Sequence, residues 1–224
     1  MPALRPMRDN DRFLTAAQLR EADRLCIEAI GIPGAVLMDH AGKAMYEATG
    51  GASPLGVVCG KGNNGGDGYV AARYALLDGV DTRVVSMVPL DSLTGDARLY
   101  CDVFQRLGGE VIVADTPEAL DAALASLDDC AVIIDALLGT GISGEVRGLY
   151  RHAIEHWPSR PRTIAADLPS GLDADTGEPC GCAVKAAVTV TMAFPKAGFQ
   201  NPAAREYTGE VLIADIGIPE SCAE

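Results

Sequence analysis

Short apolar runs alternate with stretches of helical periodicity along most of this chain, and that alternation limits its fold more than any other feature. After about residue 50, seven runs rich in Val, Ile and Ala predict buried strands. Their expected bounds are Leu55–Cys59, Thr82–Val88, Val111–Ala114, Ala131–Ile134, Thr163–Ala166, Ala187–Met192 and Val211–Ala214. Because the runs are continuously apolar, they favour a mostly parallel sheet that is covered by helices on both faces.

Helices are expected between these strands and before the first of them. Four helical stretches separate the first five strands, near Gly66–Leu77, Asp96–Leu107, Glu118–Leu127 and Val146–Trp157. Two more precede the strands: the first follows Thr15–Gln18, which has the spacing of a capping box, and the second ends near Ala48. The stripe of the first helix is mostly apolar and consists of Leu19, Ala22, Asp23, Cys26, Ile27 and Ile30. We therefore predict one doubly wound α/β domain over residues 1–224.

The charge and the cysteine content limit which binding partners and which cellular compartment are expected. With 31 acidic and 18 basic residues, the net charge of −13 argues against nucleic acid and anionic membranes. No apolar run approaches the roughly 18–20 residues that span a bilayer, and the N-terminus lacks a signal-peptide core. Among the seven scattered cysteines, only Cys180 and Cys182 lie close together, and we interpret them as structural thiols. The expected location is the cytoplasm.

The turn after the first predicted strand reads CGKGNNGGDG and contains the spacing G-x-G-x-x-G at Gly60–Gly65. Such turns let the backbone approach a phosphate at a helix N-terminus. The spacing is a weak indication, since Gly139–Gly144 matches it as well. A redox dinucleotide site also expects an acidic residue at the end of the second strand, where this chain has Val88-Pro89. Two asparagines and Asp67 exceed what a turn requires, so we predict a turn that binds a ligand.

Two further strand ends carry polar groups. Asp135 follows the fourth predicted strand and Asp167 follows the fifth. Ligands of doubly wound sheets bind beyond the carboxyl ends of the strands, so these carboxylates should lie near the Asn63–Asp67 turn. Carboxylate, amide and hydroxyl oxygens suit an alkali or alkaline-earth cation rather than zinc.

Two motif matches are interpreted as structural. His152–His156 fits the zinc-protease pattern H-x-x-E-H, but it lies in a predicted helix and the third histidine is distant in sequence. Gly60-Lys61 lacks the rest of a phosphate-binding P-loop.

The longest motifs of the chain are GNNGGDGYVAAR, DALLGTGISGEVRG, DLPSGLDADTGEP, TMAFPKAGF and VLIADIGIP. Together they resemble the NAD(P)H-hydrate epimerase family, also called the YjeF N-terminal domain. The resemblance covers about residues 10–219. It implies a Rossmann-like three-layer α/β/α sandwich with two N-terminal helices. It also implies a homodimer with one potassium ion per subunit.

The implied activity interconverts the R and S forms of hydrated NADH and NADPH, for repair by a separate ADP- or ATP-dependent dehydratase. The dinucleotide is then the substrate, and no redox cofactor is needed. By resemblance, the potassium ligands are Asn64, Asp135 and Ser170. The implied substrate contacts are Asn63, Asn64, Gly65, Gly66, Asp67, Gly139, Thr140, Gly141, Ile142, Ser143, Gly144, Glu145 and Asp167.

Inverting C6 of the hydrated ring breaks its bond either to the hydroxyl or to the ring nitrogen, and both routes need proton transfer. We predict that Asp167 is the catalytic acid/base. Some members of the family have a lysine near the end of the second strand, but Val88–Asp91 has none, which places a lysine-assisted mechanism in doubt.

Two other function classes stay open at the level of sequence. One is an NAD(P)-dependent oxidoreductase, which the missing ribose carboxylate disfavours. The other is a non-catalytic YjeF-like scaffold. The joint presence of Asn64, Asp135, Asp167 and Ser170 argues against it, as does the acidic charge against RNA.

Overall fold

The computed structural model describes residues 4–142 and 144–223. Its strands form one sheet in the order β1-β8-β7-β6-β5-β2-β3-β4. Every neighbouring pair is parallel except β1 and β8, so the predicted mostly parallel sheet is confirmed. The strand bounds are β1 Leu4–Pro6, β2 Leu55–Cys59, β3 Thr82–Ser86, β4 Val111–Val113, β5 Val132–Ala136, β6 Arg162–Ala166, β7 Val188–Met192 and β8 Glu210–Ala214.

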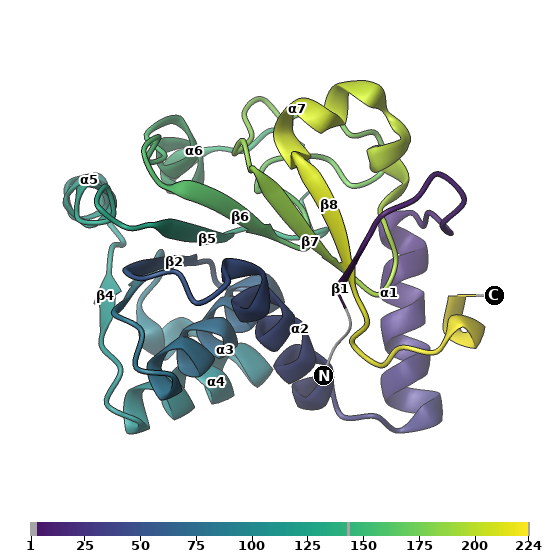
Figure 1. Cartoon of the computed structure of the whole chain (residues 1–224), viewed down its shortest axis with the longest axis horizontal. Coiled ribbons are helices and arrows are strands. Elements are labelled where there is room, and N and C mark those ends of the chain that lie inside the picture. The colour runs from purple at the N-terminus through teal and green to yellow at the C-terminus, as the bar shows by residue number, and fades with distance from the viewer. Residues whose placement is uncertain (1–3, 143, 224) are drawn as a thin grey trace.

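Helices lie on both sides of the sheet, with α2, α3 and α4 on one face and α5 and α6 on the other (Figure 1). The helix bounds are α1 Ala16–Arg24, α2 Gly34–Thr49, α3 Asn63–Leu77, α4 Gly95–Arg106, α5 Pro117–Ala125, α6 Gly148–Glu155 and α7 Arg205–Thr208. Shorter turns are η1 Leu25–Ile30, η2 Leu90–Ser92, η3 Ala197–Gln200, η4 Pro202–Ala204 and η5 Glu220–Ala223. The expected three-layer sandwich is therefore the observed architecture.

The continuous apolar runs are explained by two cores, one on each face of the sheet. Val57 belongs to the core under α2–α4, and its neighbour Val58 belongs to the core under α5 and α6. Ile134 and Ile133 divide in the same way. Because successive side chains of a strand point to opposite faces, a sheet with two covered faces needs apolar residues at every position. Each such buried side chain contributes about 1.5–3 kcal/mol.

The N-terminal helices form as the sequence predicts. The capping box of α1 is complete: Gln18 N donates to Thr15 Oγ1 at 3.3 Å, and Thr15 N donates to Gln18 Oε1 at 2.9 Å. The helix continues as the π-helical turn η1 and ends at Gly31, whose φ of +89° belongs to the left-handed region. None of the helices in the described part of the chain has the length and apolar character to cross a membrane.

The chain changes direction across the sheet at β2, which lies between β3 and β5. The segment β2–β4 builds outward on one side, and β5–β8 build outward on the other. Loops leaving β2 and β5 cross closely at this switch point, since a Cβ on Gly60 would lie 1.9 Å from the carbonyl oxygen of Leu137. Crevices at switch points are the usual ligand sites of such sheets.

Several bounds differ from expectation. Strand β1 is new, because a short exposed edge strand carries little apolar pattern. Strand β5 runs on through Asp135 and Ala136, so the carboxylate lies within the strand. Helix α3 begins at Asn63 rather than near Gly66, since Gly62 already has the extended backbone of an N-cap. The two asparagines thus form the first helical turn instead of a loop.

Candidate active site

A pocket of about 570 Å³ lies at the carboxyl ends of the central strands. Helices α1 and α2 form one wall, and the opposite wall combines the start of α3 with the loop after β5. The segment after β7 completes it with Phe194 and Lys196. This volume falls within the range of small-molecule sites, about 300–1,000 Å³.

A cluster of oxygens connects three loops beneath this pocket. The Ser170 hydroxyl donates to Asp135 Oδ1 at 2.5 Å, and Ser170 N donates to Oδ2 of the same carboxylate at 2.8 Å. Leu138 N donates to Ser170 Oγ at 2.9 Å. Asn64 Nδ2 donates to the carbonyl oxygen of Leu138 at 3.0 Å. The structure therefore brings together Asn64, Asp135 and Ser170, the three potassium ligands that the resemblance implies.

The oxygen cluster contains a buried carboxylate and a buried amide oxygen, and no cationic side chain of the described residues pairs with them. Asp135 is fully buried, and burial raises its pKa to about 6 despite the hydrogen bonds from Ser170 and Leu137. Asn64 Oδ1 is buried and accepts no hydrogen bond from the described residues. Buried polar atoms without a partner are rare, and an ion is one reason for them. A carboxylate, an amide oxygen, a hydroxyl and a carbonyl form an all-oxygen set of low charge, which fits an alkali cation.

Asp167 lies beside this cluster at the end of β6 and is held in a special conformation. Its φ of +66° is in the left-handed region, which is uncommon for a residue with a side chain. Met192 N donates to its Oδ1 at 3.1 Å, and Lys196 Nζ forms an ion pair with the same oxygen. Strained backbone of this kind concentrates at functional sites, where neighbouring contacts hold it in place.

Lys196 is the functional residue that the sequence reasoning missed. Its side chain is only 1% exposed, and Nζ also donates to Thr191 Oγ1 at 2.8 Å. The missing lysine at Val88–Asp91 had placed a lysine-assisted mechanism in doubt, but a lysine reaches the site from the segment after β7 instead. The available indication was a lone lysine inside the apolar motif TMAFPKAGF, since Lys is almost never fully buried without a partner.

Three more carboxylates line the pocket: Asp67 on α3, Asp23 on α1 and Asp96 at the start of α4. Burial raises the pKa of Asp67 well above its usual value, and the negative charges of Asp167 and Asp23 raise it further. Asp23 was counted only as an exception in an apolar stripe. Its position within that stripe was the indication that it lies on the pocket side of the helix.

The predicted substrate segment at Asn63–Asp67 divides into two groups. Asn63, Asn64 and Asp67 line the pocket. The Cα atoms of Gly65 and Gly66 face the protein, because a Cβ there would lie 2.1 Å from Gly60 O and 2.5 Å from Met38 Sδ respectively. The two glycines let the first turn of α3 pack closely, and their role as substrate contacts stays a prediction.

The second predicted segment also divides. Gly139, Thr140, Gly141 and Ile142 line the main pocket. Ser143 lies outside the described residues. Glu145 accepts from Arg151 Nη1 at 2.8 Å, next to α6, and does not line either pocket. Gly144 has a φ of +77° where the loop turns away. The part of this segment that faces the pocket is therefore Gly139–Ile142.

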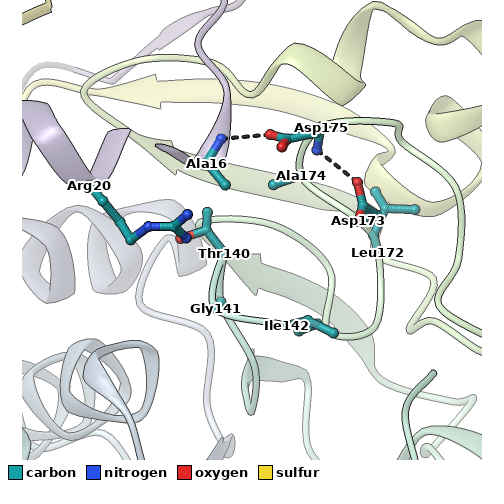
Figure 2. A pocket seen from close by; sticks show the side chains of 10 residues that line it. Ala16, Arg20, Thr140, Gly141, Ile142, Leu172, Asp173, Ala174 and Asp175 are labelled. Atoms are coloured by element: carbon teal, nitrogen blue, oxygen red, sulfur yellow. Dashed lines mark hydrogen bonds between the residues drawn. The ribbon is translucent and has the colours of Figure 1, made fainter. Parts of the chain in front are cut away.

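The same loop also lines a smaller cavity of about 260 Å³, which Figure 2 shows. Figure 2 shows the Arg20 side chain of α1 reaching toward Thr140. On the far side, Ala16 N donates to Asp175 Oδ1 at 2.6 Å, and Asp175 N donates to Asp173 Oδ1 at 2.9 Å. Arg20 lines both cavities, so it stands between them.

The motif at His152–His156 belongs to the far face of the sheet. His152 Nε2 lies 2.6 Å from Asp121 Oδ1 on α5, and the two histidine rings stack with their centroids 4.1 Å apart. Within residues 4–142 and 144–223, no group of three or more His, Cys, Asp and Glu side chains is arranged to hold a metal ion. All seven cysteines are free thiols.

These features define a class: a doubly wound α/β protein with a small-molecule pocket at its topological switch point. Residues 34–198 match the family described as YjeF-related protein N-terminus, and the chain belongs to that family.

Relatives and a solved structure agree with this assignment. The NAD(P)H-hydrate epimerase of Rhodopirellula baltica is 36% identical over 210 residues, covering 92% of this chain and 84% of its own. The bifunctional NAD(P)H-hydrate repair enzyme Nnr of Moorella thermoacetica is 37% identical over 216 residues, and the matched region covers 93% of this chain but 41% of that protein. The crystal structure of yeast ynu0, YNL200c, superposes with a TM-score of 0.73 at 22% identity, covering 84% of this chain and 83% of that one. It has the same fold.

Proposed function

We propose that this chain is an NAD(P)H-hydrate epimerase, an isomerase that interconverts the R and S forms of hydrated NADH and NADPH. The observation that carries the proposal is the Asp167–Lys196 pair, which lines a pocket of about 570 Å³ next to the oxygen cluster. The high coverage of the Rhodopirellula baltica epimerase supports the same activity. An NAD(P)-dependent oxidoreductase would have to bind the ribose without a carboxylate at the end of β3, where Ser86 stands.

The chemistry required is proton transfer at C6 of the hydrated nicotinamide ring. A bond from C6 breaks and re-forms on the other face, and no electrons are exchanged with a cofactor. Asp167 is the proposed catalytic acid/base because its carboxylate lines the pocket beside Lys196. Lys196 holds this carboxylate in one position and supplies positive charge to it.

We also propose that the oxygen cluster holds one potassium ion per subunit. The donors would be Asn64 Oδ1, the Asp135 carboxylate, Ser170 Oγ and the carbonyl oxygen of Leu138. A bound monovalent cation would neutralise Asp135 and attract the substrate phosphates. The four residues of the cluster also hold the loops that follow β2, β5 and β6 in place relative to one another.

The diphosphate needs positive charge in a protein whose net charge is −13. Three cations line the main pocket: Arg20 on α1, Lys61 before α3, and Lys196. Lys196 is already paired with Asp167, whereas Arg20 and Lys61 make no ion pair within the part of the chain that the structure describes. The proposed place for the diphosphate is therefore between Arg20 and Lys61, over the first turn of α3 and the Gly139–Ile142 loop.

The cellular setting forms a further part of the proposal. The enzyme acts as a homodimer in the cytoplasm, beside a separate dehydratase that consumes the S form. The name of the Moorella thermoacetica relative, a bifunctional repair enzyme, supports the functional coupling. Light scattering of the purified chain tests the dimer.

One assay tests the activity. A mixture of R and S hydrated NADH is incubated with an S-specific dehydratase and ATP until NADH absorbance at 340 nm stops rising quickly, leaving the R form. Adding this chain should start a second rise that is limited by the amount of epimerase. If the residual R form recovers no faster than by spontaneous epimerisation, the chain is not an epimerase. A non-catalytic scaffold would give that result.

A further inference from the structure

Asp23 occupies a position in α1 that the amphipathic pattern reserves for an apolar side chain. It lies four residues after Leu19 and three before Cys26, which share its face of the helix. Both neighbours have a role there, since Cys26 is buried and Leu19 lines the main pocket. Asp23 lines the same pocket, together with Asp67, Asp167 and Lys196. The helix therefore delivers a carboxylate to the wall of the active site.

This carboxylate is not engaged in holding the structure together. Among the described residues, Asp23 makes no ion pair and no side-chain hydrogen bond, whereas Glu21 and Glu28 of the same segment both pair with Arg24. The residue is exposed, so it can exchange protons with solvent. The Asp167 carboxylate, by contrast, is fixed by Lys196 and by Met192 N.

The surroundings of Asp23 also favour its protonated form. The protein around it removes part of the hydration of the carboxylate, although the residue is exposed, and this raises its pKa to about 6. That value of about 6 already includes an upward contribution from the charge of Asp167 and a downward one from Lys196. Asp167 is paired with a cation and Asp23 is not, and a difference of this kind between two carboxyls of one pocket is what separates a general base from a general acid.

We propose that Asp23 is a second catalytic residue of this site, the general acid that protonates the departing C6 hydroxyl while Asp167 acts as the base. This inference rests on the proposed epimerase function and adds a residue to it. The acid comes from the helical wall and the base from the strand end, so the substrate ring would lie between them.

The proposed step conserves atoms and electrons. The C6–O bond breaks with its electron pair going to oxygen, which takes the Asp23 proton and leaves as water. The lone pair of N1 forms an N1=C6 double bond. A water molecule then adds to C6 from the other face and gives a proton to Asp167, and the π pair returns to N1. The product is the S form, and exchange with solvent restores both carboxyls.

Asp67 is the competing candidate for the acid. It lines the pocket as well, but it is only 9% exposed and burial holds its pKa well above the usual value. A group that binds its proton so strongly transfers it poorly near neutral pH, whereas a pKa near the working pH suits a group that must give and take protons. Asp23 is therefore the better candidate, and the two residues can be tested side by side.

The test compares Asp23→Asn, Asp23→Glu and Asp67→Asn with the wild type in the dehydratase-coupled assay on the R form. Glu21→Gln is the matched control, because this carboxylate lies on the same helix and does not line the pocket. We expect Asp23→Asn to lower kcat about 100-fold or more with little change in KM, since general acid catalysis contributes about 10²–10⁴-fold. Asp23→Glu should recover part of that loss, and Glu21→Gln should match the wild type.

The pH profile adds a readout that a structural role would not move. A general acid must be protonated, so wild-type kcat/KM should fall as pH rises through the pKa of Asp23, and Asp23→Asn should lose this limb. The titratable and charged groups that line the pocket with Asp23 are Arg20, Lys61, Asp67, Asp96, Tyr150, Asp167 and Lys196, and Cys26 lies near it on the same helical segment. The limb is therefore assigned by its absence in Asp23→Asn and its persistence in Asp67→Asn.

The outcomes separate this inference from the proposed function. If the wild type is inactive, both the epimerase function and the role of Asp23 are overturned. An active wild type with a fully active Asp23→Asn variant overturns the role of Asp23 and leaves the epimerase intact. The same applies if Asp67→Asn alone loses kcat. A loss in Asp23→Asn that Asp23→Glu does not relieve, together with a lower Tm, would make Asp23 a structural residue and also overturn the inference.

Discussion

Lys196 and Asp167 join the ends of two neighbouring strands through a nearly buried ion pair. The lysine side chain is 1% exposed and the aspartate 17%, and the pair lies where β6 and β7 open into the pocket. Met192 N and Thr191 Oγ1 complete the contacts of the two side chains. The pair therefore fixes a carboxylate at a backbone conformation that is otherwise unfavourable.

Replacing Lys196 by Met should cost both stability and activity. Removing one partner of a buried pair leaves the other charge uncompensated, which costs about 3–5 kcal/mol in free energy of unfolding. Urea titration measures this loss, and the coupled assay measures the rate. Lys185→Met is the control, because Lys185 pairs with Glu206 at the exposed surface and its loss should change neither quantity appreciably. A Lys196→Met variant as stable as the wild type would show that the pair is not held as described.

Asp167→Asn should abolish most of the catalysis, and because it leaves Lys196 without its charge partner it should lower the free energy of unfolding as well. The amide keeps the shape of the side chain but cannot accept a proton, so the epimerisation rate should fall about 10²–10⁴-fold. The rate is measured on the R form with excess dehydratase. Normal rates in this variant would remove Asp167 from the mechanism.

Potassium should stabilise the chain through the oxygen cluster. Differential scanning fluorimetry in potassium chloride and in N-methylglucamine chloride at equal ionic strength should give a higher Tm in potassium, because an ion that binds only the folded state stabilises it. Asn64→Ala should remove most of this difference, since it deletes the unpartnered Oδ1. The matched control is Asn201→Ala, which removes a half-buried side-chain amide that donates to Thr176 O and not to a residue of the cluster. Equal Tm values in the two salts would contradict the ion site.

Arg20 and Lys61 should act on substrate affinity. Each exposed cation contributes about 0.2–1 kcal/mol, so Arg20→Ala or Lys61→Ala should raise KM about two- to fivefold. The kcat should change little, and the salt dependence of kcat/KM should weaken. Arg160→Ala is the control, because this exposed arginine lies outside both cavities. An unchanged KM in the Arg20 and Lys61 variants would place the diphosphate elsewhere.

Gly60→Ala should destabilise the protein more than the same change at Gly62. A Cβ at Gly60 would meet the carbonyl oxygen of Leu137 at 1.9 Å, whereas a Cβ at Gly62 would meet nothing within 4 Å. Forcing the crossing loops apart should cost about 3 kcal/mol or more in free energy of unfolding, against about 1 kcal/mol or less at Gly62. Urea titration of the two variants provides the comparison, and equal costs would contradict the close crossing.

The sequence predicted the layers and the seven strands well because burial on both faces leaves a continuous apolar pattern. The strand-end pattern predicted that Asp135 lies near the Asn63–Asp67 turn, since parallel strand ends bring their loops together, and the structure joins Asp135 and Asn64 with Ser170. Their role as ion ligands came from the resemblance and stays a prediction. Lys196 was missed because its partner lies 29 residues earlier in the chain, and only the adjacency of β6 and β7 connects them. Strand β1 was missed because two of its residues are exposed and its stability comes from pairing with β8.

Helix α1 lies outside the matched region 34–198, yet it provides the Arg20 and Asp23 wall of the pocket. The floor at the strand ends and this wall are thus encoded by separate parts of the chain. Changes in one nine-residue helix can alter which nucleotide fits and how its protons are handled, while the loops of the floor stay the same. Divergence of substrate preference within this fold is therefore expected to concentrate in a segment that core motifs alone do not cover.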